Sequence, residues 1–115
     1  MPMLKIETSA ALSEEQIGKV LEEGSRIVAR ILQKPEQYVM VAICEASMIM
    51  SATGGPAAFC DLRSIGGLSP ENCAALSGEL CALLAAVIEV EPDRVYLNFT
   101  ELDAAAWGWN ATTFG

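Results

Sequence analysis

The sequence predicts an α/β fold of two tandem β-α-β units, which together form a four-stranded mixed sheet with both helices on one face. Three observations support this fold: two helical stretches alternate with four short strand-like runs, the same turn chemistry recurs in both halves, and 115 residues leave room for one domain. We therefore expect a single domain over residues 1–115, with pseudo-repeated halves at about 1–57 and 58–115.

The first half predicts a strand, a helix and a second strand. Residues 3–8 alternate between apolar and polar side chains, which favours a strand. Residues 13–16 read Ser-Glu-Glu-Gln, a capping box that begins a helix. Pro35 ends this helix, and the apolar run 38–44 predicts a strand buried on both faces. The Ser-, Met-, Thr- and Gly-rich segment 47–56 predicts a connecting loop.

The second half repeats this order. Residues 58–63 predict a strand, and Ser69-Pro70 supplies an N-cap serine followed by proline at the first helical position. The helix stops before Pro92, and residues 95–100 predict the last strand. The clearest internal match aligns residues 34–38 with 91–95, an offset of 57.

Right-handed crossovers place the two strands of each unit parallel and both helices on the same face of the sheet. The opposite face then needs a cover. The chain is 52% hydrophobic with a mean hydropathy of +0.35, which is more apolar surface than a small monomer buries. We expect a homo-oligomer, with the uncharged tail 104–115 as part of the contact.

Charge and composition exclude several functions. Fifteen acidic and seven basic residues give a net charge of −8, which repels nucleic acids and anionic membranes. The absence of histidine excludes Ser-His-Asp triads and His-bound zinc. The four cysteines form no CxxC pair, and we interpret them as buried apolar residues in a reducing compartment. No signal peptide begins the chain, so we expect a cytoplasmic protein. We expect no metal site, because histidine and CxxC pairs are both absent.

Pro2 is the most informative candidate for catalysis. Initiator methionine is normally trimmed before a small residue, and trimming would expose a secondary amine at Pro2. Burial beside a positive charge would lower the pKa of that amine toward the range that suits a general base. If Met1 is retained, the Pro2 nitrogen is an amide without basicity. The structural alternative is that Pro2 only starts an edge strand.

Five segments in order resemble the macrophage migration inhibitory factor family of the tautomerase superfamily. They are Met1-Pro2-Met3, Lys34-Pro35-Glu36-Gln37-Tyr38, Ser64-Ile65-Gly66, the run from Pro92 to Asn98, and Gly108-Trp109-Asn110 with Thr113-Phe114. The resemblance implies a homotrimer with active sites between subunits. It also implies a cofactor-free phenylpyruvate tautomerase that accepts dopachrome-type surrogates.

The resemblance assigns three residues to the chemistry. Pro2 matches the N-terminal base that moves a proton between the two ends of a keto-enol system. Lys34 matches the cation that holds a substrate oxygen and keeps the proline pKa low. Ile65 matches a position whose backbone N–H donates to the substrate, so its side chain matters little. Without the resemblance, Lys34 would be a cation that favours a helix C-terminus.

Five further residues match the substrate-binding walls. Tyr96 and Asn98 match residues that the neighbouring subunit contributes, and their i,i+2 spacing puts them on one face of a strand. An aromatic rim that accepts a phenyl ring is matched by Tyr38, Trp109 and Phe114. Ordinary strand positions and plain core packing are the alternatives for these two groups.

Two departures from the family pattern limit the comparison. Residues 57–60 read Ala-Ala-Phe-Cys where some members carry CxxC, so we predict no dithiol redox activity. Trp107 adds bulk near the expected pocket, with an effect on substrate size that the sequence does not determine. The alternative functions are a secreted, receptor-binding signal exported by a non-classical route, with vestigial catalysis, and decarboxylation or hydrolytic dehalogenation on the same scaffold.

Overall fold

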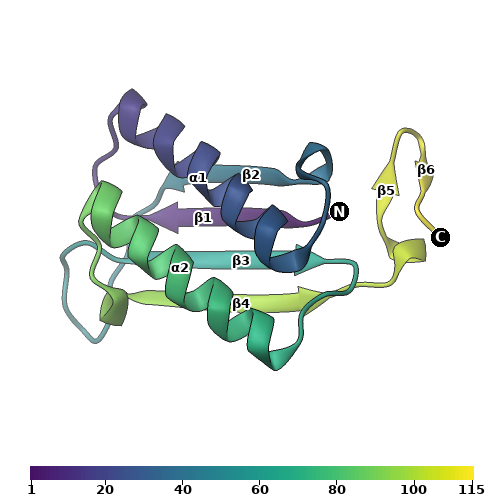
Figure 1. Ribbon diagram of the computed structural model, residues 1–115. Coiled ribbons are helices and arrows are strands. Elements are labelled where there is room, and N and C mark those ends of the chain that lie inside the picture. Colours follow the sequence, from purple (N-terminus) through teal and green to yellow (C-terminus); the bar gives the residue numbers. More distant parts are fainter.

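The computed structural model describes all 115 residues and has two helices packed on one face of a four-stranded sheet (Figure 1). The strand order is β2-β1-β3-β4, in which β1 pairs parallel with β2 and antiparallel with β3, and β3 pairs parallel with β4. This mixed sheet confirms the predicted fold class. The strands and helices are β1 (Met3–Thr8), α1 (Glu14–Leu32), β2 (Met40–Glu45), β3 (Ala58–Ser64), α2 (Pro70–Ile88) and β4 (Val95–Glu101).

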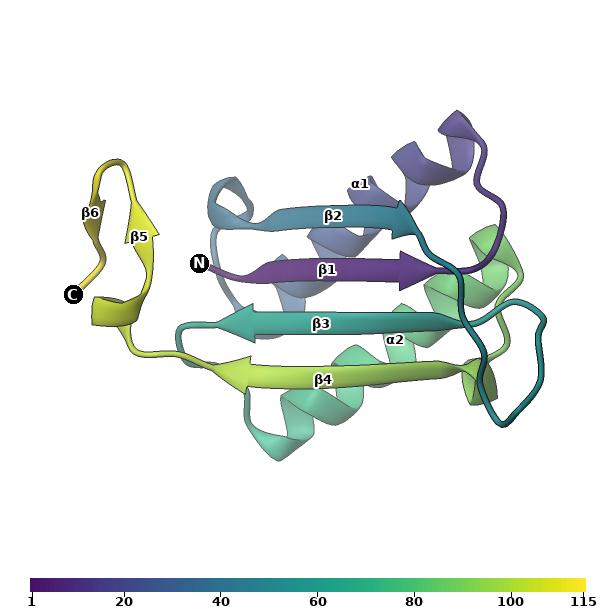
Figure 2. The same cartoon turned by 180° about the vertical axis from the view of Figure 1, so that it is seen from behind.

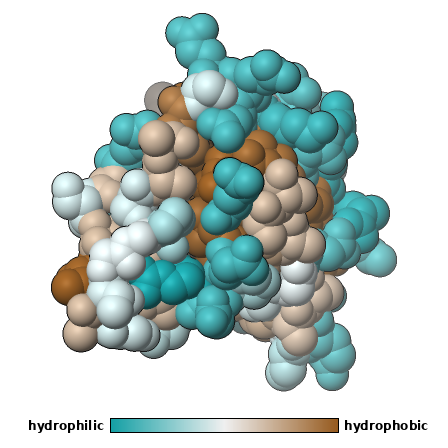
Figure 3. Space-filling view, turned by 90° about the vertical axis from the view of Figure 1, so that its left-hand side faces the viewer, coloured by the Kyte–Doolittle hydropathy of each residue, from teal (hydrophilic) through white to brown (hydrophobic).

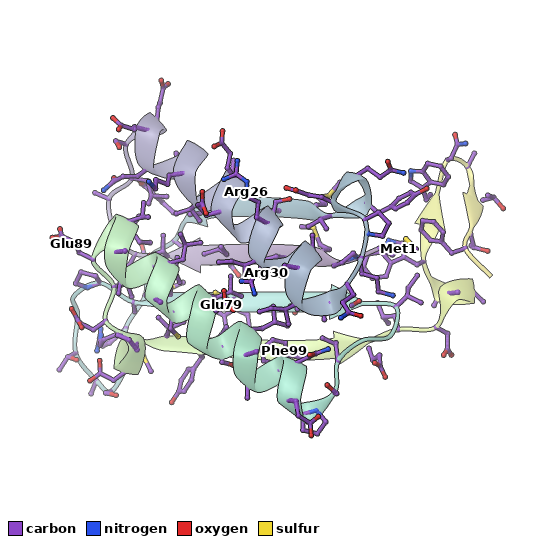
Figure 4. The ribbon with its side chains drawn as sticks, in the orientation of Figure 1. Met1, Arg26, Arg30, Glu79, Glu89 and Phe99 are labelled. Atoms are coloured by element: carbon purple, nitrogen blue, oxygen red, sulfur yellow. The ribbon has the colours of Figure 1, made fainter.

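Both helices begin and end as their sequences predict. The Ser13 hydroxyl accepts from the Gln16 N–H at 3.1 Å, and the Gln16 side-chain oxygen accepts from the Ser13 N–H at 2.9 Å, which completes the capping box. The Ser69 hydroxyl caps α2 by accepting from the Asn72 N–H at 3.1 Å, without the return bond of a capping box, and Pro70 follows it. An ion pair between Arg30 of α1 and Glu79 of α2 joins the helices across their outer surface (Figure 4).

The predicted burial of β2 on both faces is wrong for the single chain. Met40 is 65% exposed, and the rest of β2 is only half-buried or exposed. The reason is that β2 forms an edge of the sheet and only its inner face meets α1. Seen from behind, no layer covers the sheet (Figure 2). The strand also begins later than expected, because residues Glu36–Tyr38 form a 3-10 turn, η1.

The two β-α-β units are equivalent at an offset of 56 residues. At the end of β2, the Glu45 carboxylate accepts from the Leu12 N–H at 2.8 Å, and at the end of β4 the Glu101 carboxylate accepts from the Leu68 N–H at 3.2 Å. Each bond ties the end of one strand to the chain just before a helix N-cap. The same offset relates the two left-handed helix C-caps, Gln33 and Glu89, and the two buried polar residues, Thr8 and Ser64.

The offset of 57 that the sequence suggests is therefore wrong by one residue. Pro35 precedes the 3-10 turn η1, whereas Pro92 is the first residue of the equivalent turn η2 (Pro92–Arg94). Proline suits both places because each requires φ near −65°. Aligning the two prolines thus shifts the second unit.

The core lies between the helices and the sheet. By length and composition α2 is apolar enough to cross a membrane, with a mean hydropathy of 1.5, but one of its faces is buried against the sheet. At the end of the molecule where α1 begins and α2 ends, polar side chains surround apolar surface (Figure 3), and a shallow groove there includes Ala86 and Val87. The buried residues of the two helices are Val20, Gly24, Val28, Leu32, Leu76, Leu80, Leu84 and Ile88.

Candidate active site

A cavity of about 470 Å³ lies where the start of β1 meets the C-terminal hairpin. The hairpin consists of β5 (Gly108–Trp109) and β6 (Thr112–Thr113) and stands beyond the end of the sheet, facing the N-terminus (Figure 1). The cavity is mostly apolar, which suits a small molecule with an apolar body. Its lining residues are Met1, Pro2, Met3, Gln37, Tyr38, Val39, Met40, Trp107, Gly108, Trp109 and Phe114.

Pro2 is fully buried at the base of this cavity. Its carbonyl accepts from the Met40 N–H at 3.1 Å, which extends the pairing between β1 and β2 and fixes the proline next to the sheet edge. Met1 lies at the end of the sheet that faces the hairpin (Figure 4). Burial lowers the pKa of the Met1 amine below its usual value, and the positive charge of Lys34 lowers it further by a smaller amount. An amine at this end of the chain is thus deprotonated more readily than an ordinary N-terminus.

Lys34 and Ile65 contact each other, but neither lines the Pro2 cavity. The Lys34 charge acts on the Met1 amine, whereas Ile65 borders a separate cavity of about 310 Å³ with Gly66 and residues 101–104. Lys34 follows the left-handed C-cap of α1, where Gln33 has φ 54°, and its half-buried Nζ donates to the Ile65 carbonyl at 3.0 Å. Ile65 directly precedes Gly66 and Gly67, which turn the chain with positive φ angles of 74° and 84°. The bond uses one of the three Nζ donors. Two donors are therefore left for an anionic or carbonyl ligand.

Aromatic rings form the wall opposite Pro2. The Tyr38 and Trp109 rings meet edge to face with centroids 6.1 Å apart, and Trp109 stacks on Phe114 at 5.7 Å. The Phe114 N–H donates to the Trp107 carbonyl at 3.1 Å, which closes the hairpin and brings Trp107 into the wall. The sequence separates Tyr38 from the other rings by about 70 residues, so only the tertiary structure brings this wall together.

Tyr96 and Asn98 lie away from this cavity within one chain. Both are exposed on β4, and Tyr96 is 67% exposed. The strand register puts Thr100 level with Met3, so Tyr96 lies roughly 13 Å along the strand direction from that level. Tyr96 instead borders a second cavity of about 410 Å³ formed with residues 48–51 and 57–59.

Several lining residues carry no signal in the sequence. Gln37 lies in the 3-10 turn η1, and Val39 and Met40 follow that turn. The sequence pattern does not predict the turn, so it does not predict that these residues line the cavity. Met3 lines the cavity because it directly follows Pro2. No group of three or more Cys, Asp or Glu side chains is placed to hold a metal ion.

The cysteine thiols differ strongly in their surroundings. Cys60 is buried in β3, and its pKa is raised to about 12. Burial is the larger cause and the nearby Cys81 the smaller one. Cys44 is exposed on the edge strand β2, so the expectation that the cysteines are buried is wrong for this residue. We expect iodoacetamide at neutral pH to leave Cys60 unmodified in the folded protein, with peptide mass spectrometry as the readout and urea-unfolded protein as the control. Modification of folded Cys60 as fast as in the unfolded chain would contradict this.

Comparison with known proteins identifies the family of the chain. The family model described as "Macrophage migration inhibitory factor (MIF)" matches residues 1–115. Macrophage migration inhibitory factors of Meriones unguiculatus and Rattus norvegicus are each 36% identical to the chain over 115 residues, covering 99% of both partners.

Solved structures give the same result. The macrophage migration inhibitory factor-like protein of Entamoeba histolytica superposes with a TM-score of 0.95 at 30% identity, covering 98% of each chain. The homologue from Prochlorococcus marinus has a TM-score of 0.94 at 30% identity, covering 98% of this chain and 99% of that one. The chain therefore belongs to the macrophage migration inhibitory factor family and has the fold of the tautomerase superfamily.

Proposed function

We propose that this protein is a cofactor-free keto-enol tautomerase that acts on arylpyruvates such as phenylpyruvate, with dopachrome-type compounds as surrogates. One observation carries the proposal: an N-terminal amine whose pKa is lowered by burial and by Lys34 lies in an apolar, aromatic-walled cavity. Removal of Met1 would make Pro2 the N-terminal residue, with its amine in the same cavity. The family membership supports the same reading.

The proposed reaction is a proton transfer between carbon and oxygen. The neutral Pro2 nitrogen takes a proton from the carbon next to the keto group, and the electron pair of that C–H bond forms the C=C bond of the enol. The carbonyl oxygen gains negative charge, which the Lys34 ammonium stabilises. Pro2 then returns the proton to that oxygen. The reverse sequence converts the enol to the ketone.

The remaining site residues bind the substrate in this proposal. The rings of Tyr38, Trp109 and Phe114 hold the phenyl group. The Ile65 backbone N–H donates to a substrate oxygen, so replacement of its side chain has a small effect on rate.

The complete site in this proposal lies between subunits of a homotrimer. The uncovered sheet face and the exposed Met40 and Ile49, which is 72% exposed, supply apolar surface for assembly. Tyr96 and Asn98 of one subunit then reach the Pro2 cavity of the next. The proposed location is the cytoplasm.

The test compares protein with and without Met1. Intact mass identifies the processed form, and ultraviolet absorbance follows the decay of phenylpyruvate enol. Processed protein is expected to accelerate the decay. Protein that retains Met1 should match the uncatalysed rate, because its Pro2 nitrogen is an amide. A processed protein that gives only the uncatalysed rate would overturn the proposal for this substrate class.

The curated relatives support a second candidate, a signalling protein with vestigial catalysis. Relatives at 36% identity carry the name macrophage migration inhibitory factor. Receptor binding by the surface does not require a basic nitrogen at Pro2. A processed wild-type protein that gives only the uncatalysed rate, and whose Pro2→Gly variant keeps the same cell-signalling response, would favour this candidate over the first.

Trp107 is predicted to limit the size of the substrate. Its half-buried side chain lines the cavity but forms no ring pair with the other aromatic residues. We expect Trp107→Ala to improve kcat/KM for a naphthylpyruvate relative to phenylpyruvate by about tenfold, because one buried aromatic group contributes roughly 1.5–3 kcal/mol. The ratio of the two kcat/KM values measures this, and an unchanged ratio would contradict it.

A further inference from the structure

Arg94, the last residue of η2, binds a single loop with its whole guanidinium group. Nη1 donates to the Met50 carbonyl at 2.8 Å and to the Thr53 hydroxyl at 2.9 Å. Nη2 donates to the carbonyls of Thr53, Gly54 and Gly55 at 3.1–3.2 Å, and Nε donates to the Pro56 carbonyl at 3.2 Å. All three ion pairs of the chain involve other arginines, so Arg94 donates only to uncharged oxygens: five backbone carbonyls and the Thr53 hydroxyl.

The loop that Arg94 binds has an unfavourable backbone conformation. Ser51 and Ala52 have φ angles of 54° and 59°, in the left-handed region that costs free energy for residues other than glycine. Gly55 is also left-handed, with φ 103°. The turn is closed by a two-residue bridge between Met50 and Thr53. Hydrogen bonds from a cation, which are stronger than neutral ones, offset this strain.

The other side of this loop faces Tyr96. The cavity beside Tyr96 is bordered by residues 48–51, which immediately precede and include the turn that Arg94 holds. Arg94 and Tyr96 are separated by one residue, so a short stretch of chain both binds the loop and forms the facing wall. The position of Met48, Ile49 and Met50 relative to Tyr96 thus depends on the Arg94 guanidinium.

The internal pseudo-symmetry supports this role. At the offset of 56, Arg94 is equivalent to Tyr38, whose ring contacts Trp109 of the C-terminal hairpin. The lining residues Met1, Pro2, Met3 and Met40 of the Pro2 cavity are likewise equivalent to Ala57, Ala58, Phe59 and Tyr96 of the second cavity. In each unit, the last residue of the 3-10 turn anchors the segment that closes the cavity.

We propose that Arg94 is a positioning residue: it holds the 48–51 segment against Tyr96 and so shapes the wall that one subunit presents to the active site of its neighbour. The inference rests on the proposed function, in which Tyr96 contributes to the neighbouring site. Arg94 does not touch the substrate. It acts on substrate binding and not on proton transfer, because its guanidinium donates to the loop and not to the reacting atoms.

The test compares Arg94→Ala, Arg94→Lys and a control, Arg26→Ala, which removes an exposed arginine on α1. We expect Arg94→Ala to raise KM for phenylpyruvate about tenfold or more, because the displaced wall binds the substrate less tightly, with kcat within about twofold. Arg94→Lys should recover part of the loss, because lysine supplies three donors. Amide hydrogen exchange at residues 50–56 should accelerate in Arg94→Ala and stay unchanged in the control.

A subunit-mixing experiment separates this inference from the proposed function. Pro2→Gly chains carry an intact Arg94 wall, and Arg94→Ala chains carry an intact Pro2. In trimers refolded from both kinds of chain, some sites combine Pro2 of an Arg94→Ala chain with the wall of a Pro2→Gly chain. These sites should have the wild-type KM. A wild-type KM in Arg94→Ala, or unchanged exchange at residues 50–56, would overturn the inference. Full activity of Pro2→Gly alone would overturn the proposed function, and the exchange measurement would still decide whether Arg94 holds the loop.

Discussion

Replacement of Pro2 by glycine is expected to lower kcat/KM for phenylpyruvate by about 10²- to 10⁴-fold, the range that a positioned general acid-base supplies. Glycine allows Met1 to be trimmed, so the variant still has a free amine at residue 2. It lacks the buried ring that fixes the direction of the nitrogen. Enol decay measured on protein of verified mass tests this.

The control for this variant is the fold itself. The Pro2 carbonyl pairs with the Met40 N–H through the backbone, so glycine keeps that hydrogen bond. Circular dichroism and the oligomer mass should match those of the wild type. Retention of more than about a tenth of the activity would contradict this prediction, because it would show that the proline ring is not needed. Loss of the fold together with activity would show that Pro2 is structural.

Local signals in the sequence predicted most of the fold. The first strand, residues 3–8, and both helix N-caps are as expected because alternation and capping depend on neighbouring residues. The prediction that β2 is buried on both faces was wrong, because an apolar run does not indicate whether its strand lies at the edge of the sheet. The repeat offset was wrong because a proline fits two adjacent positions around a 3-10 turn.

The candidate site was predictable only as a set of residue types. The structure brings Pro2 and three aromatic residues to one cavity and puts Lys34 where its charge acts on the N-terminal amine, but it places Tyr96 near the opposite end of its strand. Arg94 carried no signal, because its acceptors are mainly backbone carbonyls, which every residue type possesses. The residue types of the loop therefore do not reveal, in a single sequence, which side chain donates hydrogen bonds to its main-chain carbonyls.

Replacement of Lys34 by alanine is expected to lower kcat/KM by about 10- to 100-fold, because a hydrogen bond to a charged group contributes roughly 1.5–3 kcal/mol. Its Nζ already lies 3.0 Å from the Ile65 carbonyl, which holds the ammonium where its charge acts on the N-terminal amine. Lys34→Arg keeps the charge but changes its shape and should retain an intermediate rate. Steady-state kinetics with phenylpyruvate enol measures these effects, and wild-type values for Lys34→Ala would contradict the proposed role.

The pH dependence of the same variant separates two effects of this lysine. Two causes lower the pKa of the N-terminal amine. Burial is the larger cause, and the Lys34 charge is the second, since a nearby cation disfavours the protonated form. The base must be neutral to accept a proton, so activity rises as pH increases through that pKa. Loss of the cation raises the pKa, and the acid limb of the kcat/KM profile should move to higher pH. A lower plateau with an unmoved acid limb would mean that Lys34 binds the substrate oxygen but does not tune the base.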